Sequence, residues 1–572
     1  MKNKIAFGSA VFFLAAGLSF SQEAIGSAEE EYFDFLHLNG VVSKESLFYR
    51  TLSDSRWSFC NLDSADFSFP WSLENVSSPF FIADFTGENE NWFLRGISKK
   101  VSAKIYGPEY FSSYNSRAPY GQNDGALWQG RGYNASFTAG ARLEAFGFEL
   151  TFKPQISFSQ NKDFEIMTPK SASHGEYSHY GSYGIDAPQR FGSSSFWTFD
   201  WGDCEIRWNF HSFTAGFGTQ SVWSGPSVQN SILLSNNAAS FPKLDFGLRK
   251  TKIILPFLNW DLGDVEARLF YGKLTESDYF DSKSENDENM LSCITFSYSP
   301  SFLEGFTVGF TKLCFSKWGE QVSKYLNPFF SGNTIKNYTG EDQVASLSAD
   351  WVFPKVGLEI YGEIGVDDFL RNGLYFYEYA RYPFHTMIYT VGLKKSIQIS
   401  KPKKIHGVIS FEWSNFEPSQ DYQMWAGSNY NFGSHGQIIQ GKTNRGQYLG
   451  SGIGYGGNSQ ILSFKVYSPH GYDKFIIGRN NPDNGFIFNK FVDKTPSNSE
   501  NPNFGYENYS AFKANFFVGA ESMWFITKKF SCTGGFLYNL IINPHFDNAV
   551  HREDYVYWNN FRFTLKLKHQ IM

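Results

Sequence analysis

Apolar and polar residues alternate along most of the chain. Between residues 133 and 143 the odd positions are apolar, and after a short turn the even positions of residues 148–156 take over. Alternation with one apolar face is typical of two antiparallel strands joined in a hairpin. The same pattern returns repeatedly and is still present at residues 561–567. We therefore expect an all-β protein whose strands fill most of the chain.

Short turns and long polar loops alternate between the expected strands. The long loops include residues 275–289, 319–341 and 469–509. Strands of about ten residues joined in this way are typical of outer-membrane barrels, because lipid offers no hydrogen-bond partner to a sheet edge and the sheet must close. If the short turns are periplasmic, they predict a transmembrane antiparallel β-barrel of about 18 strands, starting with a strand at residues 98–105. The short turns are expected near residues 145, 201, 261, 303, 355, 402, 457 and 528.

The N-terminal residues predict a different organisation. Apolar residues 5–18 follow Lys2 and Lys4 and lead to small residues, which is typical of a cleaved secretory signal at residues 1–21. Residues 22–97 are then expected to form a small periplasmic helical segment, and residues 98–572 to form the outer-membrane barrel with its extracellular plug loops.

Helix signals occur within this periplasmic segment. Ser27 and Glu30 form an S-x-x-E capping box, and Tyr32 and Phe35 share one apolar stripe. A second short helix is expected to start at Ser43. The alternative is an unstructured leader.

Composition agrees with an exported barrel. The chain is 19% aromatic and has 52 glycines, yet its mean hydropathy is only −0.34. A helical membrane protein would show about 18 consecutive apolar residues, and no such run occurs. The net charge is −6, and removal of Lys2 and Lys4 makes it more negative. This balance argues against a nucleic-acid partner, which requires a basic surface.

The cysteines are too few and too scattered for a disulfide framework or a metal site. Cys293 and Cys314 flank the turn near residue 303 and could face each other. Matching Phe296 with Phe310, however, requires an adjacent register, and a slip of one residue turns a side chain to the other face of the sheet. A disulfide between these two cysteines is left open. The five cysteines are Cys60, Cys204, Cys293, Cys314 and Cys532.

Residues 223–242 interrupt the alternation. They carry three consecutive apolar residues at 232–234, an amide-rich stretch and a closing proline. They fall between an upward strand ending near Gly218 and a downward strand starting near Lys243, which makes them an outer loop. Because Ile232, Leu233 and Leu234 need cover that water cannot provide, we expect this loop to fold across the outer mouth of the barrel as a plug.

Four segments of the chain resemble the Wzi-type capsule assembly proteins of the bacterial outer membrane. The resemblance implies an 18-stranded barrel closed by its extracellular loops, which binds capsular or related polysaccharide at the cell surface and is not an enzyme. The acidic balance of the chain departs from what an acidic polysaccharide would favour. The four segments are DFLHLNGVVSKESLFYRTLS (34–53), RAPYGQNDGALWQGRGYN (117–134), GPSVQNSILLSNNAASFP (225–242) and TNRGQYLGSGIGYGGN (443–458).

These segments supply aromatic, amide and charged side chains suited to sugar hydroxyls and ring faces. The same residue types also hold plugs in place and form interfacial girdles. The implied partners are a cell-surface polysaccharide and outer-membrane lipid, with no nucleotide and no cofactor. The candidate glycan-binding residues are Arg117, Asn123, Asp124, Trp128, Arg131, Trp223, Asn236 and Asn237.

Two other functions remain open. A porin or uptake channel would show the same alternation but an open lumen. A hydrolase would need an ordered nucleophile and base, and no G-x-S-x-G motif occurs in the chain.

Three further motifs have a simpler interpretation. Residues 436–443, GQIIQGKT, match the phosphate-loop pattern, but the residues that follow do not predict the helix that this loop requires. His174, Glu176 and His179 lack the helical spacing of a zinc site. Asp367 and Asp368 are expected at a solvated loop entrance.

Overall fold

The computed structural model describes most of the chain. The described residues are 19–20, 23–60, 80–85, 99–167, 176–177, 184–255, 258–319, 341–367, 386–417, 431–454, 456–484, 512–545 and 555–570. The predicted signal at residues 1–21 lies almost entirely outside them, and so does the predicted boundary between residues 97 and 98. The division of the chain into segment and barrel therefore remains a prediction.

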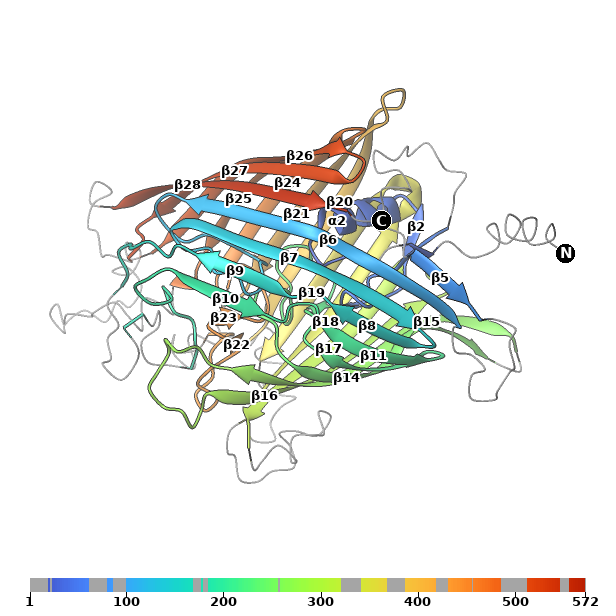
Figure 1. Ribbon diagram of the computed structural model, residues 1–572, viewed down its shortest axis with the longest axis horizontal. Coiled ribbons are helices and arrows are strands. Elements are labelled where there is room, and N and C mark those ends of the chain that lie inside the picture. The colour runs from blue at the N-terminus through green and yellow to red at the C-terminus, as the bar shows by residue number, and fades with distance from the viewer. Residues whose placement is uncertain are drawn as a thin grey trace, which may run out of the picture.

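Within the described residues, 18 antiparallel strands close into a barrel (Figure 1). Two of the 18 are interrupted, since β8 continues into β9 and β10 into β11, and β28 pairs with β6 to close the sheet. The short β5 (Phe80–Asp84) pairs with the start of β6. The wall strands are β6 (Lys100–Asn115), β7 (Gly132–Ala145), β8 (Phe148–Phe152) with β9 (Gln155–Ser159), β10 (Phe196–Asp200) with β11 (Glu205–Phe210), β12 (Phe213–Gly218), β14 (Lys243–Leu255), β15 (Trp260–Thr275), β16 (Glu288–Pro300), β17 (Phe306–Lys317), β18 (Glu341–Phe353), β19 (Leu358–Asp367), β20 (Ile388–Ser400), β21 (Ile405–Asn415), β24 (Asn458–Ser468), β25 (Gly471–Asn481), β26 (Ala514–Thr527), β27 (Phe530–Ile542) and β28 (Tyr557–His569).

The predicted alternation corresponds to the two faces of this wall. The apolar residues of the first hairpin point outward, with Phe137 47% exposed, Leu143 43% and Phe148 53% in the absence of lipid. The alternate polar residues point into the barrel, where Arg142 and Glu149 are buried. An apolar outer face and a polar interior are what a barrel in a bilayer requires. In the described part of the chain no helix is long and apolar enough to cross a membrane.

The expected number of short turns is confirmed, but two of their positions were wrong. The expected turn near residue 201 is a break between β10 and β11. These two strands run in the same direction, β10 antiparallel to β9 and β11 antiparallel to β8, and Gly202, with φ +56°, lies at the break. The chain turns instead at His211, between β11 and β12. The glycine-rich stretch near residue 457 leads into β24, and the turn lies at residues 469–470. The long loop expected at residues 469–509 was therefore wrong in its first part, which forms this turn and β25.

The first strand is longer than expected. β6 extends to Asn115 rather than ending at residue 105, and its register against β7 shifts between Tyr106 and Glu109. Gly107 and Pro108 lie in this shift, and proline has no N–H to donate to the ladder. Gly107 and Pro108 therefore interrupt the alternation of apolar and polar residues, although β6 itself continues through them.

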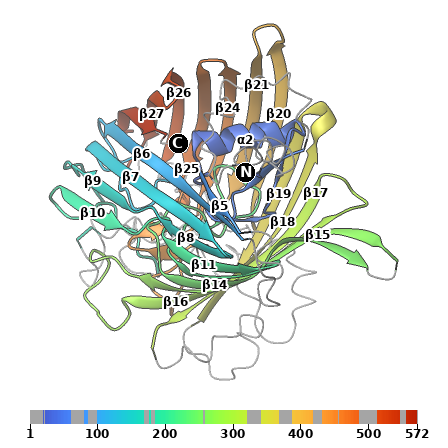
Figure 2. The same ribbon diagram turned by 45° about the vertical axis from the view of Figure 1, so that its right-hand side comes forward.

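The short turns and the end of β28 lie at one end of the barrel, which is the periplasmic end in barrels of this type. α2 (Ala28–Leu38) lies inside this mouth, alongside β20 and β24 (Figure 2). Its apolar face packs on the inner wall, where the rings of Tyr32 and Phe35 lie 5.4 and 4.9 Å from the ring of Tyr467.

The N-cap predicted at Ser27 is confirmed, and the Glu30 side chain returns to the residue before it rather than to Ser27 itself. The Ser27 hydroxyl accepts a hydrogen bond from the Glu30 N–H at 3.2 Å, and the Glu30 carboxylate accepts one from the Gly26 N–H at 2.6 Å. The second helix expected at Ser43 was wrong, because the chain there forms β2 (Val42–Lys44), which pairs with β4 (Trp57–Phe59). Residues 23–60, which also contain β3 (Tyr49–Arg50), are called the N-terminal insert below.

The two neighbouring cysteines, Cys293 and Cys314, are not joined in a disulfide. The predicted register of Phe296 against Phe310 is confirmed, and it places Cys293 opposite Leu313 rather than opposite Cys314. Residues one position apart in register point to opposite faces of the sheet, so these two thiols do not meet.

Candidate functional site

The loop between β12 and β14 folds into the barrel. This segment, residues 219–242, is called the outer plug below. Its β13 (Trp223–Ser224) pairs with β3 of the N-terminal insert, so the two inserts meet inside the wall. The predicted burial of its apolar centre is confirmed: Ile232, Leu233 and Leu234 are 0%, 3% and 2% exposed.

Two other parts of the chain surround this apolar centre. Inward-facing residues of the wall supply most of the contacts, and a second loop, residues 431–454, covers it from another side. Each buried side chain of this size contributes roughly 1.5 to 3 kcal/mol, so the centre holds the outer plug in one position. Its neighbours are Phe270, Leu274, Leu291, Leu313, Phe315, Val344, Ile388, Phe416, Phe432, Ile438 and Leu449.

Polar contacts lock the second loop to the outer plug. The Asn237 amide donates to the Tyr448 carbonyl at 2.9 Å, and the Ser235 N–H donates to the Leu449 carbonyl at 2.8 Å. The loop contains the short strands β22 (Thr443–Asn444) and β23 (Gln447–Tyr448). The two loops therefore fill the outer half of the barrel as one unit.

The phosphate-loop match lies in this second loop and anchors it to the wall. The Lys442 ammonium is 2.9 Å from the Asp367 carboxylate and 3.4 Å from that of Asp342. Thr443 starts β22 rather than a helix. The solvated entrance expected at Asp367 was wrong, since this residue is 2% exposed and pairs with Lys442. Asp368 lies outside the described residues.

A wall glutamate holds the start of the outer plug. The Glu412 carboxylate, on β21, accepts hydrogen bonds from the N–H groups of Val228, Gln229 and Asn230 at 2.8 to 3.2 Å. The Tyr361 hydroxyl donates to the same carboxylate at 2.8 Å. Three successive N–H groups form a concave site for an anion, and here the barrel wall supplies that anion.

The predicted glycan-binding residues fall into two groups. In the first group, the loop between β6 and β7 meets the outer plug. The Asn123 N–H donates to the Asn237 side-chain oxygen at 3.1 Å, and its amide donates to the Gln229 carbonyl at 3.0 Å. The Gly125 N–H donates to the Asn236 carbonyl at 2.8 Å.

A cavity of about 400 Å³ adjoins this junction. Asn123, Asp124, Trp223 and Asn236 border it, together with Arg562 from β28. Burial raises the pKa of Asp124, and Arg562 opposes this rise. Trp223 is 2% exposed. Its indole N–H donates to the Ser227 carbonyl at 2.9 Å, and the Arg50 guanidinium lies 5.5 Å from the ring centre.

The second group lies apart from this cavity. The Arg117 guanidinium lies over the Trp558 ring at 4.9 Å, with 41% of its side chain exposed. The Trp128 ring packs on Phe191 with centroids 4.8 Å apart. Arg131 donates to the Ser116 carbonyl at 3.2 Å. Glycan contact by either group remains a prediction.

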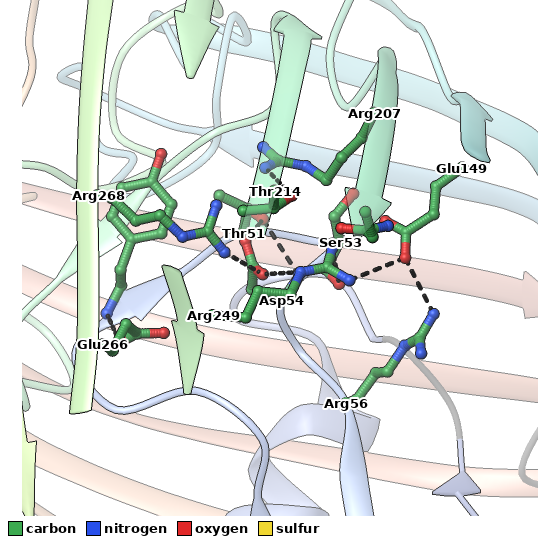
Figure 3. Close-up of polar contacts among 12 residues, drawn as sticks. Thr51, Ser53, Asp54, Arg56, Glu149, Arg207, Thr214, Arg249, Glu266 and Arg268 are labelled. Carbon is green, nitrogen blue, oxygen red and sulfur yellow. Dashed lines mark hydrogen bonds and ion pairs between the residues drawn. The ribbon is translucent and has the colours of Figure 1, made fainter. Parts of the chain in front are cut away.

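The residues that hold the N-terminal insert were missed in the sequence. Asp54 lies between two wall arginines (Figure 3), with its carboxylate 2.6 Å from Arg268 and 3.0 Å from Arg249. Arg249 also pairs with Glu149 at 2.8 Å, and Arg56 reaches the same glutamate at 3.1 Å. The alternation marks these wall residues as inward-facing, but no local signal connects them to Asp54.

Burial would raise the pKa of Asp54, but the ion pairs with Arg268 and Arg249 outweigh it and lower that pKa. The carboxylate is therefore charged at neutral pH and bridges the two arginines. Arg268 and Arg207 also share the Asp245 carboxylate at 3.0 and 2.8 Å.

The histidine-rich candidate for a metal site is largely outside the described residues. His174 and His179 are not described, and Glu176 is. Across the described ranges, no group of three or more histidine, cysteine, aspartate or glutamate side chains is placed to hold a metal ion.

Fold and interior together define an outer-membrane β-barrel whose lumen is filled by an N-terminal insert and by folded outer loops. The sequence profile described as capsule assembly protein Wzi matches residues 116–465, and the chain belongs to this family. No curated protein matches the sequence.

The chain is also similar to solved structures. Wzi of Escherichia coli, described as an outer-membrane protein involved in group 1 capsule assembly and a carbohydrate-binding β-barrel, is 10% identical, with 82% of this chain and 85% of that chain covered and a TM-score of 0.50. OprB of Pseudomonas putida is 11% identical, with 82% and 94% covered and a TM-score of 0.35. At 10% identity, the similarity to Wzi is informative about the fold alone.

Proposed function

We propose that this protein binds and organises capsular or related polysaccharide at the cell surface, and that it does so as a lectin-like protein without catalysing a reaction. Membership of the capsule assembly family supports polysaccharide as the ligand. The carbohydrate binding described for Escherichia coli Wzi supports direct contact between protein and polysaccharide.

The observation that carries the proposal is the junction between the β6–β7 loop and the outer plug. Asn123 and Asn236 come from segments more than 100 residues apart, yet both border one cavity of about 400 Å³, and Asn237 joins the two segments by accepting a hydrogen bond from the Asn123 N–H. A concave site with a few placed polar groups is the usual form of a small-ligand site. Side-chain amides both donate and accept hydrogen bonds, as sugar hydroxyls do.

A porin is the second candidate, and the outer plug argues against it. An open channel needs a hydrated lumen, whereas Ile232, Leu233 and Leu234 are buried against the wall and the second loop. We therefore expect low ion conductance from the parent protein.

Deletion of residues 228–240 tests the proposal. We expect it to raise single-channel conductance and to lower cell-bound polysaccharide, because one segment both fills the lumen and carries Asn236 and Asn237. A deletion of residues 282–285, which are exposed in the loop between β15 and β16, is the control and should change neither. Asn236→Ala, which removes a side chain that borders the cavity and leaves the bond from Asn237 to Tyr448 in place, should lower polysaccharide retention and leave conductance low.

The opposite result would favour a channel. A parent that already conducts strongly, with conductance and cell-bound polysaccharide unchanged in the deletion, would contradict the proposal. Purified parent and Asn236→Ala protein on a glycan array would then identify any sugar that the protein binds without retaining polysaccharide at the cell surface.

A further inference from the structure

The periplasmic rim of the barrel has two unlike halves. Going around the wall from β7 to β17, the four short turns contain no lysine or arginine, and their exposed apolar residues include Phe302 at 83%, Leu258 at 56% and Phe146 at 40%. From β18 to β27, three of the four short turns carry exposed lysines, and none of the four carries an acidic residue. This set, called the lysine arc below, is Lys355, Lys401, Lys403, Lys404, Lys528 and Lys529.

Each turn of the lysine arc lies next to an outward-facing apolar side chain. Val356 follows Lys355 and is 57% exposed. Ile399 lies two positions before Lys401 and is 50% exposed, and Ile526 lies two positions before Lys528 and is 61% exposed. Ile399 and Ile526 continue the outer apolar faces of β20 and β26, so the lysines begin where the lipid-facing surface ends.

Aromatic side chains mark the same level of the wall. Trp524 on β26 is 54% exposed and stacks on His470, in the neighbouring turn, with ring centres 6.2 Å apart. Tryptophan, tyrosine and lysine near the ends of spanning strands lie at the headgroup level of a bilayer. The lysine arc is therefore positioned beside the phosphates of the inner leaflet.

We propose that the lysine arc binds the phosphate groups of anionic phospholipids in the periplasmic leaflet of the outer membrane. Exposed isoleucine and valine beside each lysine favour lipid over a soluble polyanion, because a soluble polyanion has no acyl chain to cover them. The chain as a whole is acidic, with a net charge of −6, so a basic half-rim is a local feature and not a reflection of composition.

The test compares anionic with zwitterionic lipid bound to the full-length protein. Purified protein is equilibrated with equal amounts of phosphatidylglycerol and phosphatidylcholine in detergent, and native mass spectrometry gives the ratio of the two lipids bound. Because each lysine at an anionic surface contributes roughly fivefold in binding, replacing all six with glutamine should lower the ratio about fivefold or more. A gel assay of heat modifiability shows that the variant barrel is folded.

A charge-matched pair makes the test specific. The triple variant K401Q/K403Q/K404Q should lower the lipid ratio, whereas K162Q/K283Q/K317Q, which removes three exposed lysines from the outer side, should not. An unchanged ratio in the six-lysine variant, or an equal fall in both triples, would overturn the proposal. If the six-lysine variant instead loses binding of soluble polyphosphate at an unchanged lipid ratio, the partner is a soluble polyanion and the lipid assignment is wrong.

Discussion

The two inserts that fill this barrel are held by different chemistry. The N-terminal insert enters from the periplasmic end and is tied to the wall by ion pairs, such as Asp54 with Arg268 at 2.6 Å and Asp34 with Lys394 at 3.2 Å. The outer plug enters from the other end, and its centre is apolar, with Ile232 fully buried. Its polar contacts are mainly neutral amide and hydroxyl hydrogen bonds.

One feature is common to both inserts. Glu266, on β15, accepts hydrogen bonds from the N–H groups of Leu47, Phe48 and Tyr49 at 3.0 to 3.2 Å, as Glu412 does for three successive N–H groups of the outer plug. In both places the wall supplies a carboxylate to a short stretch of backbone that has no strand partner for these N–H groups. The backbone of both inserts is therefore anchored in the same way. The inserts differ in the surrounding side chains, which add ion pairs in one case and apolar contacts in the other.

This difference predicts different sensitivities. Ion pairs inside a protein depend on protonation, and breaking one leaves an uncompensated buried charge. Apolar burial depends on shape and area and does not change with pH. The N-terminal insert should therefore respond to acid and to loss of one of its ion-pair charges, and the apolar centre of the outer plug should respond to neither.

The largest effect is expected from Asp54→Ala. It removes the carboxylate shared by Arg268 and Arg249, and disrupting a buried pair of this kind costs about 3 to 5 kcal/mol; Asp245 and Glu149 still pair with these arginines, which favours the lower figure. Hydrogen exchange of residues 47–56 should speed up accordingly. Exchange in the outer plug should stay the same.

Asp278→Ala, in an exposed outer loop, is the control for this substitution and should leave both inserts unchanged. Equal loss of protection in the two inserts of the Asp54 variant would show that they are stabilised as one unit, and the comparison would fail.

Acid should loosen the N-terminal insert next. Burial would raise the pKa of Glu31, but Lys465 and Lys474 outweigh it and lower the pKa from 4.5 to about 2. A carboxylate with a lowered folded pKa stabilises fully above its unfolded pKa, and this contribution, at most about 3 kcal/mol, is lost as the pH falls from 4.5 toward 2. Burial also lowers the pKa of His37 from 6.5 to about 4, so the folded state loses stability below pH 6.5 as well.

Hydrogen exchange of α2 between pH 6.5 and 2.5, corrected for the intrinsic rate, measures this loss. Glu31→Gln should remove the part of the slope below pH 4.5. A matching slope in the outer plug would mean that acid weakens the whole barrel and not the charged insert.

The sequence was informative wherever the structural cause is local. Alternation is read residue by residue, so the strands, the outward face of Phe137 and Phe148, and the position of the outer plug between Gly218 and Lys243 were all predicted. The N-cap at Ser27 is local as well. The turns near residues 201 and 457 were wrong because a glycine-rich break and a true reversal look alike in sequence.

The contacts that hold the inserts could not be predicted from one sequence. Asp54 and Arg268 are 214 positions apart, and Glu412 lies 182 positions from Asn230. Every wall strand has inward-facing polar residues, and nothing in the pattern says which of them meets which insert. For the candidate glycan site, the residue types were read from the sequence. Their separation into a first group beside the cavity and a second group away from it depends on these long-range contacts.

The smallest effect is expected from replacing each of the two wall glutamates, Glu266 and Glu412, with glutamine, and the two substitutions should differ in their cost in stability. In Glu266 one oxygen, Oε2, accepts all three N–H groups, and Oε1 has no hydrogen-bond partner among the described residues. The glutamine of E266Q can therefore keep its carbonyl oxygen toward the backbone and turn its NH₂ group to the vacant side. In Glu412 both oxygens are used, since Val228 donates to Oε2 and Asn230 to Oε1. The NH₂ group of E412Q must face one of these donors.

We expect E412Q to cost about 2 kcal/mol, because it loses one hydrogen bond to a charged group and leaves a buried donor unsatisfied, and E266Q to cost about 1 kcal/mol or less, because it loses only the charge. Exchange rates at residues 228–230 and 47–49 measure the two costs, and E165Q, at a residue whose side chain is 66% exposed, gives the baseline. Only E412Q should also raise ion conductance, since it loosens the segment that leads into Ile232. A larger cost for E266Q than for E412Q would mean that charge, and not the count of occupied oxygens, decides how firmly the wall holds an insert.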